Sequence, residues 1–384
     1  MYPQLFSKHA ARLNTRLLQQ LWAWLHTAEG ALVCATLLGH ALLHLALPLF
    51  MPLPYFSELS AHDGRSYYAL AYDPVPAQPA YSLMRYKRVL FALAARAAWP
   101  WDAHIGFALI GIAAAAMANL FVYRILARYT QQPLRPALLF ACSPYLFAAA
   151  HLALPDPVSV ALTLAALYAL LEGRFGRLVL YSALALLFKE VAATAVLALA
   201  VLAYGRWGWR RAATYLALCG LPVLGVVAVY GQAWGQWQWY LLESRSTIVP
   251  APITLVWLIA SAASPAIVRL DSAINLGILA LLAWALWRLR SIDRRLLVYS
   301  LIVVVPLLFL DERQYQSDFD MARQYMAVAP ALLAFAGPAN RAGRWLFQAL
   351  LAGMIAYGMY YILSISTFFV TYKHEILSML TLFW

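Results

Sequence analysis

The sequence has few charged residues for its size: only 11% of its 384 residues are Asp, Glu, Lys or Arg, while 64% are hydrophobic. A water-soluble globule of this length needs far more polar side chains to cover its surface. The mean hydropathy of +0.70 fits a chain that lies mostly in lipid. The scarcity of charge therefore predicts an integral membrane protein.

Cysteine is also scarce, and the histidines are scattered. Cys34, Cys142 and Cys219 lie within apolar runs without CxxC spacing, which indicates packing residues rather than a disulfide framework or a zinc site. His40 and His44 form an i, i+4 pair deep in the first apolar run, where packing with hydrogen bonds is favoured over metal binding. No metal ligand is predicted and no cofactor is certain, while a divalent cation stays open.

A cleavable leader and an internal repeat are also missing. Lys8, Arg12 and Arg16 precede the first long apolar run, but no small-residue cleavage site follows, so residues 1–27 are predicted to be a cytoplasmic, interfacial helix. The long polar loop after the first span has no counterpart in the second half, which counts against a carrier built from inverted repeats. We expect one transmembrane domain over residues 1–384.

Long apolar runs recur along the whole chain, as in "GFALIGIAAAAMANLFVY" and "LFQALLAGMIAYGMYYILSISTFFV". Several approach the roughly 20 residues that a helix needs to cross the hydrocarbon of a bilayer. They do not alternate apolar and polar residues as barrel strands do. The predicted fold class is therefore all-α, a polytopic bundle of transmembrane helices that satisfy their own backbone hydrogen bonds.

Basic residues fall in short clusters between the apolar runs, at 124–135, 174–177, 205–211, 288–295 and 340–344. Such loops mark the cytoplasmic side, so the net charge of +12 reports topology and no nucleic-acid partner is predicted. Threading the chain with these clusters inside gives about eleven spans, with the C-terminus outside. Nearly all carboxylates then face outward, and residues 52–102 form a long first extracytoplasmic loop.

Two tracts fit this threading poorly. Lys189 and Glu190 interrupt an apolar tract and leave pieces too short to cross about 30 Å of hydrocarbon. We predict two short helices that meet below the outer surface, with these two residues at the floor of a recess. Ionisable groups at membrane depth are costly and are usually functional or mutually paired. Residues 253–272 are predicted to be interfacial or re-entrant.

The first outer loop carries an unusual concentration of charge. In "HDGRSYYALAYDP", Asp63 followed by Gly64 predicts a turn that holds a carboxylate at the mouth of the bundle. Beyond it, "YSLMRYKRVLFALAARAAW" has the pattern of an interfacial amphipathic helix whose Arg and Lys side chains extend towards headgroups. An element that borders both lipid and solvent suits an enzyme whose substrate is a lipid.

These features together resemble the GT-C class of membrane glycosyltransferases. The "DG..Y..A.DP" and "RYxR" segments are similar to those of uncharacterised bacterial members and, distantly, of the GPI mannosyltransferase type. The resemblance implies an inverting glycosyltransferase of the bacterial inner membrane with its active site on the extracytoplasmic face. It also implies a polyprenyl-phosphate-linked sugar as donor, contact with membrane lipids, and a lipid, glycan or protein as acceptor.

The resemblance places the role of catalytic base on Asp63. A carboxylate can accept the proton of the acceptor hydroxyl as it attacks the anomeric carbon, and cations stabilise the charge that grows on the leaving phosphate. The candidate substrate-binding residues on the predicted outer face are Arg65, Asp73, Arg85, Lys87, Arg88, Asp156, Lys189, Glu190 and Arg323.

Each candidate also has a plain structural explanation. The aspartates could only start turns or stop helices beside proline, and the "RYKR" residues could only anchor headgroups. Lys189 and Glu190 could pair with each other. The alternative function is a transporter or flippase for a lipid or small solute, which would show a distributed pathway in place of one dominant carboxylate. A nucleophilic Ser, Thr or Cys motif for another lipid-modifying transferase is missing from the outer loops.

Overall fold

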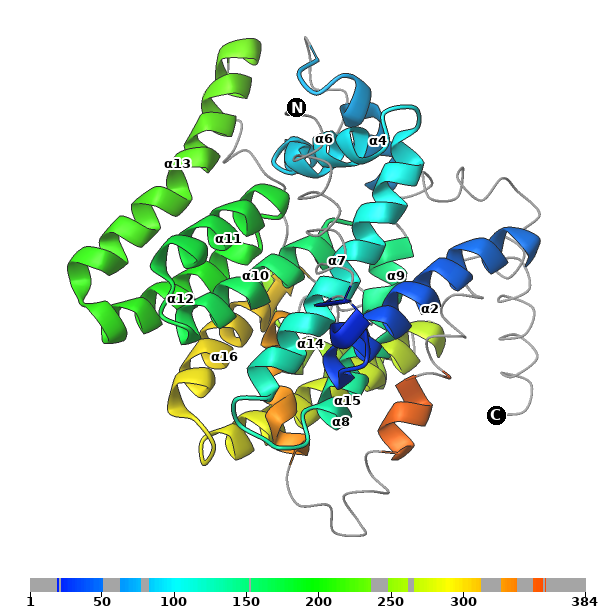
Figure 1. The fold of residues 1–384 in the computed structure, drawn as a ribbon, viewed down its shortest axis with the longest axis vertical. Coiled ribbons are helices and arrows are strands. Elements are labelled where there is room, and N and C mark those ends of the chain that lie inside the picture. Colours follow the sequence, from blue (N-terminus) through cyan, green and yellow to red (C-terminus); the bar gives the residue numbers. More distant parts are fainter. Residues whose placement is uncertain are drawn as a thin grey trace, which may run out of the picture.

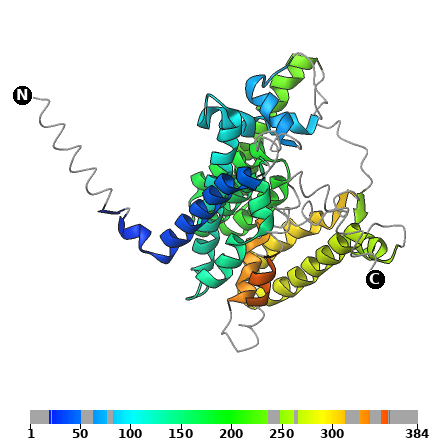
Figure 2. The same cartoon turned by 90° about the vertical axis from the view of Figure 1, so that its right-hand side faces the viewer.

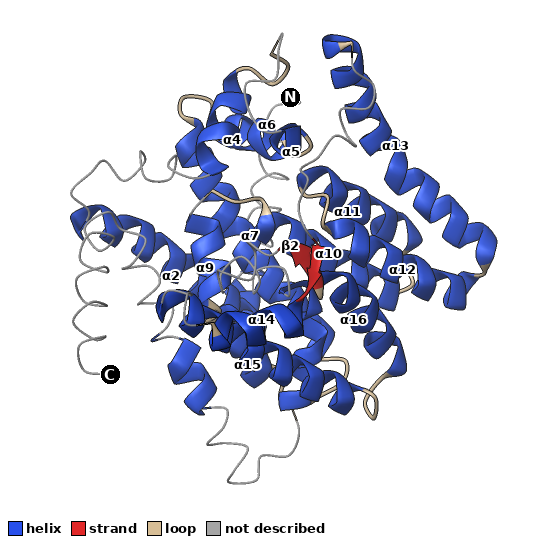
Figure 3. Cartoon of the chain, turned by 180° about the vertical axis from the view of Figure 1, so that it is seen from behind, coloured by secondary structure: helices blue, strands red, loops and turns tan. Residues whose placement is uncertain are grey.

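The computed structural model describes residues 19–20, 22–50, 63–76, 83–151, 153–235, 248–261, 266–311, 326–336, 348–354 and 356. Within these ranges the chain is a bundle of helices with one small sheet of two strands (Figures 1 and 3). The helical class is therefore confirmed, while the count of about eleven spans stays a prediction. Most of the predicted N-terminal segment, residues 1–27, and Arg323 lie outside the described residues.

The elements follow one another along the chain as α2 (Ala28–Phe50), α4 (Asp63–Tyr72), α5 (Leu83–Tyr86), α6 (Val89–Ala98), α7 (Ala103–Leu126), α8 (Leu134–Ala141), α9 (Pro144–His151), α10 (Asp156–Leu171), α11 (Phe175–Phe188), α12 (Ala192–Trp207), α13 (Trp209–Trp234), β1 (Ile248–Pro250), α14 (Ala251–Ala260), α15 (Ala266–Leu289), α16 (Arg294–Leu307), β2 (Phe309–Asp311) and the 3-10 helix η1 (Met326–Phe335). Strands β1 and β2 pair antiparallel, with Val249 opposite Leu310.

Helix α7 forms the centre of the bundle and packs against α2, α6 and α10 (Figure 1). Three stretches of the described part are long and apolar enough to cross a membrane: Ala103–Leu126, Trp209–Trp234 and Ser272–Leu289. Small buried residues such as Ala115 and Ala118 face the neighbours of α7, and small side chains allow helix backbones to approach closely in lipid. The structure therefore supports a multi-pass membrane protein.

Helices α10, α11 and α12 are shorter than a membrane is thick. They contain 16, 14 and 16 residues, which gives lengths of about 24, 21 and 24 Å, against about 30 Å of hydrocarbon. Helix α11 ends at Phe188 and α12 begins at Ala192, so the predicted helix break at Lys189 and Glu190 is confirmed. Helices α4 and α6 lie over this end of the bundle (Figure 1).

The segment predicted to be one interfacial helix is broken into α5 and α6. Lys87 and Arg88 lie at the break and are buried, with 8% and 6% of their surface exposed. The prediction that these two side chains extend to headgroups is therefore wrong. The reason is that Arg88 finds a carboxylate inside the protein, which compensates the cost of removing its charge from water.

Residues 253–272 are divided between two packed helices. Most of the tract lies in α14, which contains 10 residues, and in the beginning of α15. A helix of 10 residues is about 15 Å long and does not cross a membrane. The interfacial or re-entrant character of the tract stays a prediction, because the structure contains no membrane.

The C-terminal end of α13 is hydrogen-bonded to the segment that follows α4. Tyr230 donates its hydroxyl to the carbonyl of Pro74, and the Trp234 indole N–H donates to the carbonyl of Pro76 at 2.9 Å. The Tyr86 ring packs edge-on against Trp234 at 4.8 Å between centroids. In Figure 2 the green end of α13 meets the blue α4–α6 segment at the top. One end of a long apolar helix is thereby fixed to the predicted outer side.

This geometry predicts that Asp73 and Arg211 lie on opposite sides of the membrane, because α13 has 26 residues and is about 39 Å long. Both side chains are exposed. In a chain whose three cysteines are replaced by alanine, an impermeant maleimide should label Asp73→Cys from outside intact cells and Arg211→Cys only after the membrane is opened. Labelling of both positions from the same side would contradict the topology.

Candidate active site

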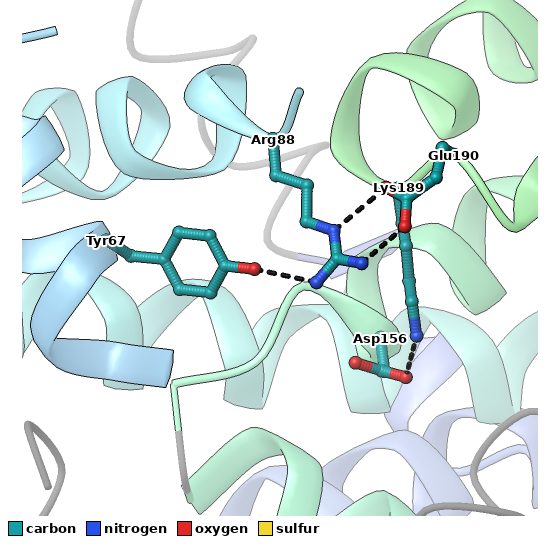
Figure 4. A network of polar contacts seen from close by, with 5 residues as sticks. All are labelled: Tyr67, Arg88, Asp156, Lys189 and Glu190. Atoms are coloured by element: carbon teal, nitrogen blue, oxygen red, sulfur yellow. Dashed lines mark hydrogen bonds and ion pairs between the residues drawn. The ribbon is translucent and has the colours of Figure 1, made fainter. Parts of the chain in front are cut away.

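Arg88 joins three elements at the end of the bundle beneath α4 and α6 (Figure 4). Its Nε donates to Oε2 of Glu190 at 2.9 Å, and its Nη2 pairs with the other oxygen of the same carboxylate. Its Nη1 donates to the Tyr67 hydroxyl at 2.9 Å. The guanidinium therefore makes a two-pronged ion pair with the turn between α11 and α12 and a third bond to α4, which fixes its orientation.

Lys189 makes a second ion pair in the opposite direction. Its Nζ donates to Oδ1 of Asp156, the first residue of α10, and the two side chains are only 6% and 3% exposed. The backbone of Lys189 is extended, with φ −158° and ψ 125°. Neighbouring side chains of an extended chain point to opposite sides, so Lys189 reaches α10 while Glu190 reaches Arg88. The structure therefore pairs Lys189 with Asp156 and Glu190 with Arg88.

The four charged groups form one neutral, largely buried cluster. Arg88 and Lys189 carry the two positive charges, and Glu190 and Asp156 carry the two negative charges. Each buried charge therefore lies against a charge of opposite sign, which compensates part of the cost of removing it from water.

A small cavity adjoins the Asp156–Lys189 pair. Its volume is about 30 Å³, and its polar lining includes the hydroxyls of Ser159, Thr163 and Thr194. A cavity needs roughly 10–15 Å³ to hold a water molecule, so this one has room for about two. Asp156, Ser159 and Thr163 are spaced i, i+3, i+7 along α10, which places them on one helix face.

Helix α4 is held on two sides beneath the predicted outer surface. Tyr67 is fully buried and bonds to Arg88, while the Tyr68 ring stacks on the His104 ring of α7 at 3.9 Å. The Asp102 side chain accepts from the His104 backbone N–H at 2.9 Å and so begins α7. These contacts fix the helix that begins at Asp63.

The predicted site residues fall into two groups. Arg88, Asp156, Lys189 and Glu190 come together in the buried cluster, and the Arg85 guanidinium lies 5.9 Å from the Tyr67 ring centroid. Lys87 is buried at the same α5–α6 break. The remaining predicted residues are not brought to the cluster by any described contact.

Asp63, Arg65 and Asp73 belong to that second group. Asp63 and Arg65 are the first and third residues of α4, so Asp63 starts a helix rather than a turn, and the structure describes only the backbone of both. Asp63 lies one helical turn before Tyr67. Asp73 directly follows α4 and is exposed. The catalytic role of Asp63 stays a prediction.

Four residues of this region were missed by sequence reasoning: Tyr67, Ser159, Thr163 and Thr194. The spacing of Ser159 and Thr163 after Asp156 in an otherwise apolar helix was a signal that could have identified them. Tyr67 is the tyrosine of the "DG..Y" start that carries the resemblance, but its bond to Arg88 could not be foreseen, because Arg88 lies on another element.

A divalent cation finds no ligand set in the described part of the chain. No three His, Cys, Asp or Glu side chains gather there. The carboxylates of Asp156 and Glu190 are each held by a cationic side chain.

No protein-family model matches the sequence, and no curated protein matches it. Among solved structures, the fold is similar to the crystal structure of ArnT from Cupriavidus metallidurans in the apo state, with a TM-score of 0.50 and 13% sequence identity. The match covers 82% of this chain and 62% of that chain, so this chain spans less than two thirds of the length of ArnT. At this identity the similarity shows a shared fold.

The buried ion pair between Lys189 and Asp156 predicts strong coupling between the two residues. Lys189→Met leaves the Asp156 carboxylate buried beside an apolar side chain and should lower the free energy of unfolding by roughly 3–5 kcal/mol. Adding Asp156→Asn should restore part of the loss, because no unpaired charge then remains. Thermal unfolding of both single variants and the double variant in detergent measures this coupling. Additive losses would mean that the two residues act independently.

Proposed function

We propose that the chain is a membrane glycosyltransferase of the GT-C type that transfers a monosaccharide from a polyprenyl-phosphate carrier to a lipid, glycan or protein acceptor. The observation that carries the proposal is the buried cluster of Arg88, Lys189, Asp156 and Glu190 beneath the first outer segment. It occurs in a fold that is similar to that of ArnT. We place the reaction on the extracytoplasmic face of a bacterial inner membrane.

The cations of the cluster suit the leaving group of this reaction. Breaking the bond between the sugar and the carrier increases the negative charge on the phosphate, and fixed cations lower the energy of that transition state. Glu190 and Tyr67 use three of the five N–H groups of Arg88, so a second N–H on each of Nη1 and Nη2 can donate to a phosphate while Glu190 holds the guanidinium in place. We assign phosphate binding to Arg88 and Lys189, and we propose Arg65, Arg85, Lys87 and Arg323 as further cations of the site.

The carboxylates have separate roles in this proposal. Asp63 takes the proton of the acceptor hydroxyl while that oxygen attacks the anomeric carbon from the side opposite the phosphate. The new C–O bond forms as the bond to the phosphate oxygen breaks, so the configuration inverts and the carrier phosphate leaves with the electron pair. Asp156 and Glu190 position Lys189 and Arg88, and Asp73 contacts the sugar or the acceptor.

The short lengths of α10, α11 and α12 are the reason why we place the phosphate-binding site at their outer ends. Because α10, α11 and α12 do not span about 30 Å, their outer ends lie within the membrane, at a depth that the phosphate of a membrane-anchored carrier can reach. A transporter would instead need a polar route along the whole bundle. The four charged side chains of the buried cluster gather at the N-terminal end of α10.

Incubation of the purified protein in nanodiscs with a panel of polyprenyl-phosphate sugars tests the function directly. We expect mass spectrometry to detect released polyprenyl phosphate and a glycosylated acceptor with at least one sugar of the panel. A protein that moves the labelled carrier across a proteoliposome membrane but releases no carrier phosphate would be a flippase, and the proposal would be wrong.

Asp63→Asn tests the catalytic base. Asparagine keeps the shape of the side chain but cannot accept the proton, so turnover should fall by roughly 10² to 10⁴ while donor binding survives. Asp102→Asn is the matched control: it removes another carboxylate of the outer segment, and asparagine also begins helices well.

The single-turnover rate and the donor affinity of both variants decide the assignment. Equal rates for wild type and Asp63→Asn, with a verified donor and acceptor, would show that Asp63 is not the base. A similar loss in both variants would indicate a general effect of charge at the outer surface.

A further inference from the structure

Two turns contact each other at the end of the bundle opposite the buried charged cluster. Arg206, near the end of α12, donates from Nη1 to the carbonyl of Leu170 at 2.6 Å. Gly173 has φ +76°, and a Cβ at this position would lie 2.6 Å from Nη2 of Arg206. The rings of Phe175 and Trp207 pack edge-to-face at 5.5 Å. The turn between α10 and α11 and the turn between α12 and α13 therefore form one surface.

This surface displays four exposed arginines, which we call the inner arginine patch: Arg174, Arg177, Arg210 and Arg211. The sequence of the two turns, residues 172–177 and 206–211, contains one carboxylate, Glu172. Glu172 pairs with Arg128 and lies 3.7 Å from Arg174. The patch therefore carries a clear excess of positive charge.

An exposed tryptophan accompanies these charges. Trp209 is 65% exposed, and the Arg210 guanidinium lies 5.8 Å from its ring centroid. Tryptophan and arginine side chains favour the boundary between hydrocarbon and headgroups, where one end of each side chain meets lipid and the other meets water.

The position of α13 fixes the depth of the patch. Its last turn is bonded to Pro74 and Pro76 of the outer segment. Its 26 residues reach about 39 Å, which exceeds the roughly 30 Å of hydrocarbon. Arg210 and Arg211, in the first turn of α13, therefore lie at the headgroups of the other leaflet.

Helix stability does not explain these arginines. A cation in the first turn of a helix is unfavourable, because the N-terminal end of a helix already carries positive partial charge. Arg206 and Arg128 donate to carbonyl groups of this region, whereas the four arginines of the patch are exposed, with Arg174 beside Glu172. The preference of cytoplasmic loops for basic residues explains the side of the membrane on which they lie, and an anion outside the protein is the partner that their clustering suits.

We infer that the inner arginine patch binds the phosphate of an anionic phospholipid, such as phosphatidylglycerol or cardiolipin, in the leaflet opposite the active site. Guanidinium groups match the oxygens of a phosphate diester, and basic clusters between transmembrane helices select anionic headgroups. The Trp209 ring would lie beside the lipid glycerol. The inference does not depend on the proposed enzyme activity.

Native mass spectrometry of the detergent-purified protein tests this inference. With titrated phosphatidylglycerol we expect retained lipid adducts at concentrations at least about tenfold lower than with phosphatidylcholine. Changing the four arginines of the patch to glutamine should weaken phosphatidylglycerol binding at least tenfold. The matched control changes Arg288, Arg290, Arg294 and Arg295 to glutamine. These four exposed arginines belong to another basic turn, and the control should bind within about twofold of wild type.

Three results would overturn the inference: equal retention of the two lipids, equal loss in both four-residue variants, or displacement of the lipid by millimolar inorganic phosphate. The last result would indicate a site for a soluble anion. If the glutamine variant does not fold, replacing the four residues by lysine keeps the charge but removes the fork. That variant should still bind the lipid several-fold more weakly than wild type, and unchanged binding would contradict the inference.

Discussion

The structure depends on the neutralisation of Arg88. A guanidinium buried at membrane depth is very costly unless a carboxylate lies against it. Glu190 supplies that carboxylate, and Tyr67 occupies another donor of the same group. Because these residues come from three separate segments, the α5–α6 break, α4 and the α11–α12 turn have to be in place together. The pairing explains why a charged segment that could have remained at the lipid surface folds over the bundle instead.

The helix break at Lys189 and Glu190 is what allows the two ion pairs to form. An uninterrupted helix would place successive side chains about 100° apart on one continuous surface. The extended residue at the break instead directs Lys189 to Asp156 and Glu190 to Arg88. One turn therefore joins α10 to the segment formed by α4, α5 and α6.

Charged side chains are buried in ion pairs at one end of the bundle and exposed at the other. At the recess, two cations and two carboxylates cancel inside the protein, where solvent cannot screen them. At the inner turns, arginines outnumber carboxylates and remain exposed. Helix α13 links the two ends, because its last turn is bonded to the outer segment and its first turn carries two arginines of the inner patch. A buried cluster of fixed charges suits the proposed reaction, in which negative charge grows on a leaving phosphate. An exposed excess of positive charge suits the attraction of anionic lipid headgroups.

Hydropathy and spacing predicted the membrane environment, the helical class and the break at Lys189 and Glu190, because the hydropathy and length of each apolar run can be read from the chain. The chain also identified Arg88, Asp156, Lys189 and Glu190 as candidates, since ionisable groups are rare in apolar tracts. The three-dimensional contacts were needed to show which carboxylate each cation meets, that Lys87 and Arg88 are buried, and that Tyr67 takes part. These outcomes depend on contacts between residues as far apart as Arg88 and Glu190, and local periodicity contains no information about such partners.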